Sequence, residues 1–161
     1  MDLLLKQNLL LMIRALYFCV EEKWAELGKN HNISPAQQHV LFLLYSSKSK
    51  ILSPSELSDL GGWHISTVSR LIKPMENRGF ITITPDKRPK YKEVKITDSG
   101  MILLQDLISE VDKISTFPLD ISHLTESEVE SFLHVIQKIL YSNRSITYGS
   151  WLARVKTGSD D

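Results

Sequence analysis

The sequence predicts a mainly helical fold that carries one small β-hairpin. Apolar residues recur at three- and four-residue spacing through most of the 161 residues, which is typical of helices that pack on one face. The period changes to two over residues 80–84 and 91–96, on either side of a basic segment that contains two prolines. Ser-Pro and Ser/Thr-x-x-Glu signals divide the helical part into separate segments.

The first predicted helix covers residues 3–28 and is apolar around most of its circumference. Leu5, Leu9, Met12 and Leu16 form a stripe at helical spacing, and further apolar residues widen that stripe. A helix that is apolar on nearly all sides is buried on nearly all sides. Because this helix opens a small domain, we expect it to pack against a second chain.

The same segment is not expected to cross a membrane. The run Leu9–Val20 is apolar except for Arg14, and its length of about 12 residues is well below the ~20 that a membrane span needs. No small-residue cleavage site follows it. We therefore expect a cytoplasmic protein with no membrane partner.

Three helices and a hairpin follow in the middle of the chain. Ser34-Pro35 opens a helix with an apolar face, Ser53–Glu56 forms a capping box before a short helix that ends at Gly61-Gly62, and a longer helix covers about residues 64–78. Its inner face is Val68, Leu71, Ile72 and Met75, and its outer face is Ser66, Thr67, Ser69, Arg70, Lys73 and Asn77. Residues 80–84 and 91–96 form the hairpin around a basic tip.

Two more helices close the predicted fold. Thr97 caps a helix over about residues 98–115, which we expect Pro118 to end. A capping box at Thr125–Glu128 opens a last helix that reaches about Tyr141. Residues 143–161 give weak signals and form a C-terminal tail.

The formal net charge of zero conceals a strong segregation of charge along the chain. Residues 48–97 carry ten basic and five acidic side chains, whereas residues 98–142 carry two basic and eight acidic ones. A basic middle segment favours an anionic partner. The short helix, the glycine turn and the longer helix form a helix-turn-helix, and the basic hairpin adds a wing.

In a winged helix-turn-helix the second helix enters the DNA major groove and the wing lies along the duplex. Small hydroxyl residues allow close approach, an arginine can bind guanine with two hydrogen bonds, and wing cations release counterions from phosphates. The residues predicted to contact DNA are His64, Ser66, Thr67, Ser69, Arg70, Lys73, Lys87, Arg88 and Lys90. Arg70 and Lys73 could instead form a solvated face, Arg88 could pair with Asp86, and His64 could only cap the helix.

Several segments resemble the MarR family of regulators. They are Ile65–Leu71, Glu76–Ile81, the wing motif Asp86-Lys87-Arg88 and the segment Val94–Gly100. Gly61–Thr67 and the His39 segment are similar to the Hpr/ScoC-like branch of bacilli, which represses protease and sporulation genes. One departure is Pro74, which stands where the family has a polar or charged residue and should kink the recognition helix after Lys73.

The resemblance implies a homodimer that binds a pseudo-palindromic DNA operator. It implies one domain over residues 1–161, with dimerisation helices in 1–32 and 101–142, the winged helix-turn-helix in 33–100 and a tail in 143–161. The dimer contacts then involve Leu5, Leu9, Met12, Leu16, Phe132, Ile136 and Leu140. The family also admits a small-molecule effector, which the sequence does not identify.

Other chemistries find little support in the sequence. Cys19, the single cysteine, is expected to be a small buried hydrophobe, because the peroxide-sensing branch of the family has its cysteine about two turns earlier, near Leu10. The five histidines lack metal-ligand spacing, His39 being expected in the core or a pocket, and no catalytic constellation is visible. We therefore predict a regulator with no cofactor and no enzymatic activity, the alternative being a winged-helix module that binds proteins.

Overall fold

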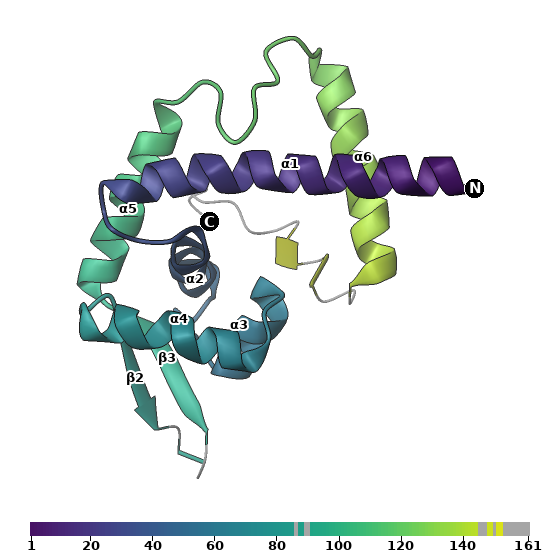
Figure 1. The fold of residues 1–161 in the computed structure, drawn as a ribbon. Coiled ribbons are helices and arrows are strands. Elements are labelled where there is room, and N and C mark those ends of the chain that lie inside the picture. The colour runs from purple at the N-terminus through teal and green to yellow at the C-terminus, as the bar shows by residue number, and fades with distance from the viewer. Residues whose placement is uncertain (86, 89–90, 145–147, 150, 153–161) are drawn as a thin grey trace.

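The computed structural model describes residues 1–85, 87–88, 91–144, 148–149 and 151–152 (Figure 1). Its described part confirms the predicted fold class, which is mainly helical with a small antiparallel sheet. The elements are α1 (Leu3–Lys29), α2 (Pro35–Ser46), β1 (Ile51–Leu52), α3 (Pro54–Gly61), α4 (Ile65–Asn77), β2 (Ile81–Pro85), β3 (Lys92–Ile96), α5 (Asp98–Asp112) and α6 (Glu126–Asn143).

The predicted helix starts are confirmed by their capping geometry. The hydroxyls of Ser34, Ser53 and Thr125 each accept a hydrogen bond from the backbone N–H three residues later. In all three cases the side chain of that third residue accepts from the cap N–H in return, which completes a capping box. Thr97 caps α5 through a bond from the Gly100 N–H.

The sheet has three strands, one more than the sequence predicts. The order is β1-β3-β2, so β3 is the central strand. Val94 of β3 pairs with Leu52 of β1 on one side and with Ile83 of β2 on the other. A two-residue strand such as β1 has no period of its own, so a periodicity argument cannot find it. Its pairing fixes the loop before α3 to the sheet and therefore ties the helix-turn-helix to the wing.

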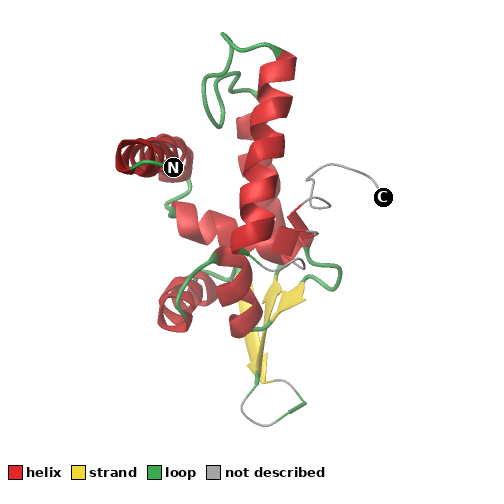
Figure 2. Cartoon of the chain, turned by 90° about the vertical axis from the view of Figure 1, so that its right-hand side faces the viewer, coloured by secondary structure: helices red, strands yellow, loops and turns green. Residues whose placement is uncertain are grey.

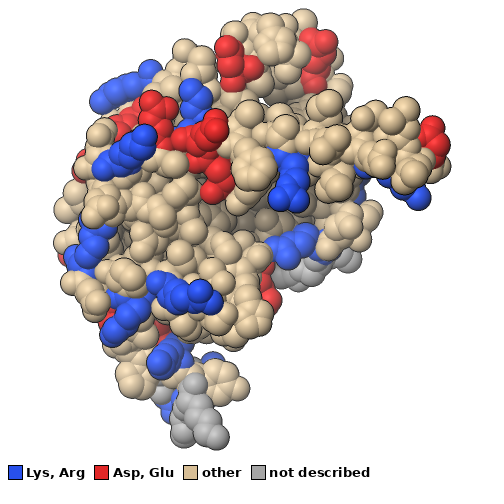
Figure 3. Space-filling model, viewed as in Figure 1, with Lys and Arg blue, Asp and Glu red and all other residues tan. Residues whose placement is uncertain are grey.

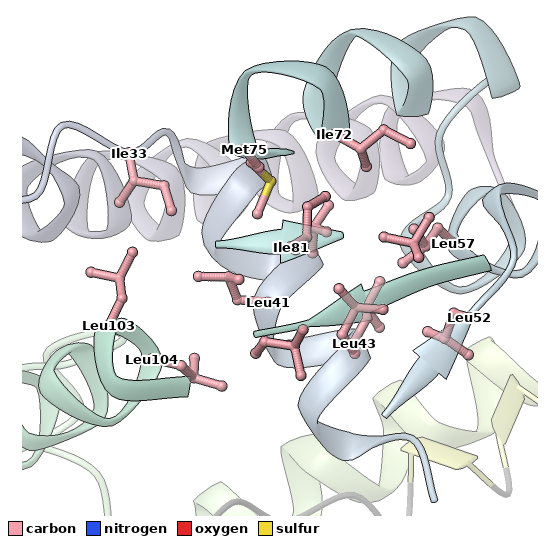
Figure 4. Packing of buried hydrophobic residues seen from close by; sticks show 14 of the residues in the cluster. Ile33, Leu41, Leu43, Leu52, Leu57, Ile72, Met75, Ile81, Leu103 and Leu104 are labelled. Carbon is pink, nitrogen blue, oxygen red and sulfur yellow. The ribbon is translucent and has the colours of Figure 1, made fainter. Parts of the chain in front are cut away.

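The hydrophobic core lies where α2, α3, α4, α5 and the sheet meet. Leu41 and Leu43 of α2 and Ile81 of β2 are at most 1% exposed. Figure 4 shows Ile72 and Met75 of α4 pointing toward them. Because this core fixes the inner face of α4, the outer face of α4 is held in a defined direction.

Helices α1 and α6 lie largely outside this core (Figure 2). No residue of α6 is buried, and in α1 only Leu27 and Gly28 are. The large apolar side chains that remain exposed on α1 include Leu5, Leu9, Met12 and Leu16. The single chain therefore leaves most of α1 uncovered, as is expected of a helix that packs against a second chain.

The membrane argument from the short apolar run is wrong on length. Helix α1 contains an 18-residue window with a mean hydropathy of 1.5, none of it buried, so by length and composition alone the helix could cross a membrane. The run Leu9–Val20 underestimates the apolar length, because Leu3, Leu4 and Leu5 extend it toward the N-terminus. Exposure of this kind is equally the property of a helix that packs between two copies of a chain.

Two smaller expectations also need correction. Cys19 is exposed in the single chain, not buried. Helix α5 ends at Asp112, five residues before Phe117, and not at the proline that follows. Residues 113–117 form successive turns, which bring the Phe117 ring against Trp24 of α1 at 4.8 Å between centroids.

Candidate nucleic-acid interface

The turn between α3 and α4 sets the direction of the candidate recognition helix. Gly62 has a positive φ of 69° and ends α3 with a bond from its N–H to the Ser58 carbonyl. The Ser58 hydroxyl donates to the Trp63 carbonyl at 2.6 Å, and the Trp63 N–H donates to the Ser58 carbonyl at 3.1 Å. Since a side chain at φ near +70° is strained, glycine is the residue favoured at this point of the turn.

His64 is the N-cap of α4, as one of the two sequence interpretations held. Its Nδ1 accepts from the Ser66 N–H at 3.3 Å and lies 2.8 Å from the Ser66 hydroxyl. Accepting at Nδ1 leaves the proton of a neutral imidazole on Nε2, which is then a donor. The ring is exposed at the N-terminal end of α4. Contact between His64 and DNA stays a prediction.

The outer face of α4 carries the polar side chains that the sequence predicts. Ser66, Ser69, Arg70 and Lys73 are exposed and Thr67 is half-buried, whereas Val68, Ile72 and Met75 are buried. Helix α4 runs through Pro74 to Asn77, and the kink expected after Lys73 stays a prediction. The Ser69 hydroxyl donates to the Ile65 carbonyl at 3.3 Å, which leaves its oxygen able to accept.

Lys73 has an intramolecular partner in Glu76, three residues later on the same helix. Its Nζ lies 2.8 Å from a carboxylate oxygen of Glu76, and this hydrogen bond lowers the pKa of Glu76 below its usual value. An exposed pair of this kind contributes only about 0–1 kcal/mol, so an anionic ligand can compete for the lysine. Among the described residues, no ion pair is found for Arg70, which leaves its guanidinium available.

The wing brings further cations to the same side of the molecule. Lys87 and Arg88 are exposed at the end of the β2–β3 hairpin, and the Arg88 guanidinium lies 4.4 Å from the centroid of the Tyr91 ring. Asp86 of the predicted wing motif and Lys90, a predicted DNA contact, lie outside the described residues. Figure 3 shows Lys and Arg side chains over α4 and the hairpin in the lower part of the molecule, with many Asp and Glu side chains above them.

Arg78 follows α4 but does not belong to this surface. Its guanidinium donates to the carbonyl of His31 at 2.8 Å and to that of Asn32, and stacks 4.7 Å from the Phe80 ring centroid. It therefore ties the end of α4 to the α1–α2 loop. Arg78 is one of the ten basic residues of segment 48–97, but its guanidinium binds backbone carbonyls of the same chain and is not available to DNA.

The residues predicted to form a dimer are apolar and accessible in the single chain. Leu5, Leu9, Met12 and Leu16 lie on α1, and each is 40% exposed or more. On α6, Phe132 is 46% exposed, and Ile136 and Leu140 are half-buried. Their role as dimer contacts stays a prediction.

A cavity of about 590 Å³ lies between α1 and the winged unit. Its lining is mainly apolar and aromatic, and Trp24, Phe42 and Trp63 contribute rings. His39 lines it as well, as expected of a core or pocket residue, and burial lowers the pKa of its imidazole. Gln38, 2% exposed, has a side-chain oxygen that is buried without a hydrogen-bond partner.

Comparison with known proteins agrees with this geometry. The model of the MarR family matches residues 33–89, which run from the start of α2 into the wing. The chain is 32% identical over 113 residues to the HTH-type transcriptional regulator Hpr of Bacillus mycoides (strain KBAB4) and of Bacillus cereus (strain B4264). The chain belongs to the MarR family. The matched region is 68% of this chain, and it spans 59% of the length of these relatives.

Solved structures of MarR-type proteins share the fold. The Staphylococcus aureus MepR–DNA complex superposes with a TM-score of 0.72 at 23% identity, covering 83% of this chain and 96% of that one. A mutant MarR of E. coli complexed with operator DNA gives 0.76 at 19%, covering 87% and 99%. The MarR family regulator Sco5413 of Streptomyces coelicolor gives 0.74 at 16%, covering 88% and 96%. These structures show the shared fold, and the family model together with the Hpr matches confirms the predicted resemblance to MarR-type and Hpr-like regulators.

Proposed function

We propose that this protein is a transcriptional regulator, acting as a repressor, that binds double-stranded DNA with sequence specificity. One observation carries the proposal: α4 buries Val68, Ile72 and Met75 in the core and leaves its hydroxyl and cationic side chains exposed on the opposite face. A helix of this kind, with its N-terminal residues free, is the element that reads base edges in a major groove. The Hpr relatives are named as transcriptional regulators, which supports the regulatory role.

The chemistry of the surface assigns different tasks to its side chains. Arg70 reads guanine through two hydrogen bonds to O6 and N7. Ser66, Thr67 and Ser69 bind phosphate or base edges at short range, and Lys73 exchanges Glu76 for a phosphate. Lys87, Arg88 and Lys90 supply affinity that does not depend on sequence, through counterion release.

The regulator acts as a homodimer in the cytoplasm. Two recognition helices about 34–36 Å apart match successive major grooves, so a pseudo-palindromic operator requires two copies. Both α1 and α6 carry exposed apolar residues, Phe132 among those of α6. One dimer interface that buries both sets accounts for the exposure of each helix in the single chain. A membrane span would use α1 and leave α6 unexplained. Sedimentation in detergent-free buffer decides between the two: the proposal requires a soluble dimer.

DNA binding is tested by selecting sites from random duplexes with the purified protein and measuring affinity at two salt concentrations. Affinity for the selected site must fall steeply with salt, and a pseudo-palindrome must emerge. Lys138→Ala, which removes an exposed cation from α6, is the matched control for removal of a cation from α4 or the wing. Absence of selection together with salt-insensitive, weak binding would favour the alternative, a winged-helix module that binds proteins.

The cavity beside His39 supports a second proposal, that a small apolar ligand modulates DNA binding. Glu21 is the only Asp, Glu, Lys or Arg among the described lining residues, so the cavity suits a neutral or cationic ligand better than an anion. Gln38 lines the cavity, and its side-chain oxygen lacks a hydrogen-bond partner and is closed off from solvent; after a small rearrangement of the Gln38 side chain it would accept from one hydroxyl or N–H group of a ligand. Titration with 2-naphthol should give tighter binding than naphthalene, and Gln38→Met should abolish that difference. Equal binding of both compounds to the unaltered protein would contradict the proposal.

A further inference from the structure

The end of α6 reaches the helix-turn-helix, although α6 buries none of its own residues. Arg144 is the C-cap of α6, and its N–H donates to the Leu140 carbonyl at 2.7 Å. Its side chain then crosses to α3, where Nη2 donates to the Asp59 carbonyl at 3.0 Å. Figure 1 shows the C-terminal end of α6 descending toward α3.

The contact fits the needs of the α3 terminus. The last four carbonyls of a helix lack partners within the helix, and Asp59 is in the last turn of α3. A cation at a helix C-terminus is further stabilised by the helix dipole. The other hydrogen bonds at this helix end are local and involve Ser58. Arg144 adds one more from a distant part of the chain.

The turn is shaped to receive this guanidinium. A Cβ atom added at Gly62 would lie 3.2 Å from Nη2 of Arg144, so the absence of a side chain at Gly62 lets the two groups approach. Gly62 and Trp63 are followed directly by the His64 cap of α4. Gly62 is two residues and Asp59 five residues before this cap, so a displacement of the turn is transmitted over a short length of chain to the start of the recognition helix.

Aromatic residues after α6 hold Arg144 in place on its other side. The guanidinium lies 4.6 Å from the centroid of the Tyr148 ring, and the Tyr148 and Trp151 rings are 5.8 Å apart. Trp151 in turn packs against the hydrophobic core. Gly149 is buried against Tyr141 of α6, where an added Cβ would overlap the ring. Arg144 is exposed, but its guanidinium is held from two sides, by the Asp59 carbonyl and by the Tyr148 ring.

We propose that Arg144 is a positioning residue that couples α6 to the α3–α4 turn and so sets the angle at which α4 is presented. The inference rests on the proposed function, in which α6 forms part of the dimer and α4 reads DNA. In a dimer, that angle determines the distance between the two recognition helices. Arg144 therefore influences which half-site spacing is bound, without itself contacting DNA.

The test compares Arg144→Ala with Lys138→Ala, which removes a cation from the same helix without a described side-chain bond. Affinity is measured for the selected operator and for versions with one base pair inserted or deleted between half-sites. The unaltered protein and Lys138→Ala should both discriminate strongly among the three. Arg144→Ala should lose about 3- to 10-fold on the selected operator while the spacing penalty shrinks, since a freer α4 tolerates other distances.

Two outcomes would overturn the inference. If Arg144→Ala keeps the spacing preference, the contact does not position α4. If it weakens all spacings equally and lowers the salt slope by about 1 per protomer, Arg144 binds phosphate directly. Arg144→Lys should give intermediate spacing discrimination, because it keeps the charge but loses the planar group that stacks on Tyr148.

A measurement without DNA separates this inference from the proposed function. Amide hydrogen exchange at Gly62 and Trp63 should be faster in Arg144→Ala than in Lys138→Ala, with exchange of the α2 core amides unchanged. Unchanged exchange at the turn would refute the coupling even if DNA binding were established. Conversely, faster exchange in a protein that selects no operator would leave the coupling in place and refute the regulatory role. Thermal unfolding of each variant confirms that the fold is retained.

Discussion

Replacement of Arg70 by alanine is the sharpest single test of the recognition surface. The side chain is exposed, and in the described part of the chain it takes part in no ion pair. Its removal should therefore change the unfolding free energy by no more than about 0.5 kcal/mol, as for other exposed positions without structural partners. Any large effect on DNA binding is then an effect on the interface and not on the fold.

The magnitude follows from the chemistry of one contact and the symmetry of the dimer. A bidentate arginine–guanine contact contributes about 1–3 kcal/mol of discrimination per half-site. A homodimer loses the contact twice, which gives about 2–6 kcal/mol for independent half-sites. At 1.36 kcal/mol per factor of ten, affinity for the operator should fall by roughly 30-fold to 26,000-fold. Nonspecific affinity should fall far less, because only one weak electrostatic contact per protomer is lost.

The assay is fluorescence anisotropy with the selected operator and with a scrambled duplex, at one fixed salt concentration. The expected result is a collapse of the ratio between the two affinities, and the lost selectivity should concentrate at one guanine of each half-site. Lys138→Ala should preserve the ratio. If Arg70→Ala keeps the operator preference while affinity falls equally for both duplexes, Arg70 contacts only phosphate, and base reading has to be assigned to other residues of α4.

Four further predictions follow from the same structure and sequence. Lys90→Ala should weaken binding to all duplexes alike and reduce the salt slope by about 0.9 per protomer, which affinity measured across a salt series checks. Leu57→Ala should lower the unfolding free energy by about 2–5 kcal/mol in urea titration, because Leu57 is fully buried; a loss below 1 kcal/mol would mean that the core closes around the gap. Leu16→Glu should sediment as a folded monomer, because Leu16 is 40% exposed in the single chain and is proposed to be buried in the dimer. A dimer of unchanged mass in sedimentation velocity would exclude Leu16 from the interface. Burial lowers the pKa of His39 below its ordinary 6.5, so the unfolded chain binds more protons than the folded one and the free energy of unfolding should fall as the pH drops below about 6.5. His39→Phe should reduce the loss of stability between pH 7.5 and pH 5.5, measured by urea titration. Equal losses in the two proteins would contradict this.

The helix starts could be predicted because their determinants are local. Ser34, Ser53 and Thr125 each satisfy a backbone donor three residues away, and such a signal is complete within four residues of sequence. The outer face of α4 was predictable for a related reason: the buried positions of α4 recur at helical spacing, which assigns the remaining positions to the surface. The assignment of Ser66, Ser69 and Arg70 to that surface needs no tertiary information.

Features that depend on distant partners were not predictable in this way. Strand β1 exists only because Leu52 pairs with Val94, and two residues carry no periodic signal. The bonds of Arg78 to the His31 and Asn32 carbonyls and of Arg144 to the Asp59 carbonyl join residues 46 or more positions apart. The sequence does not tell whether an arginine guanidinium binds a phosphate of a ligand or a backbone carbonyl of the same chain. Only the fold distinguishes the arginines that hold it together from those left to meet a ligand.

That distinction alters the electrostatic argument for DNA binding. The ten basic residues of segment 48–97 do not act as one cationic surface, since Arg78 is engaged by loop carbonyls and Lys50 lies 3.9 Å from the Tyr45 ring centroid. Arg70 and Lys73 of α4 and Lys87 and Arg88 of the wing are exposed, and much of the acidic charge on the face in Figure 3 lies above α4 and the wing. The Debye length is about 8 Å at physiological ionic strength, so acidic side chains farther than this from the duplex scarcely oppose binding, whereas a duplex approaching the acidic side would meet them directly. A protein with no net charge can therefore bind DNA in one orientation, and the arrangement of its charges, not their sum, determines which face the duplex meets.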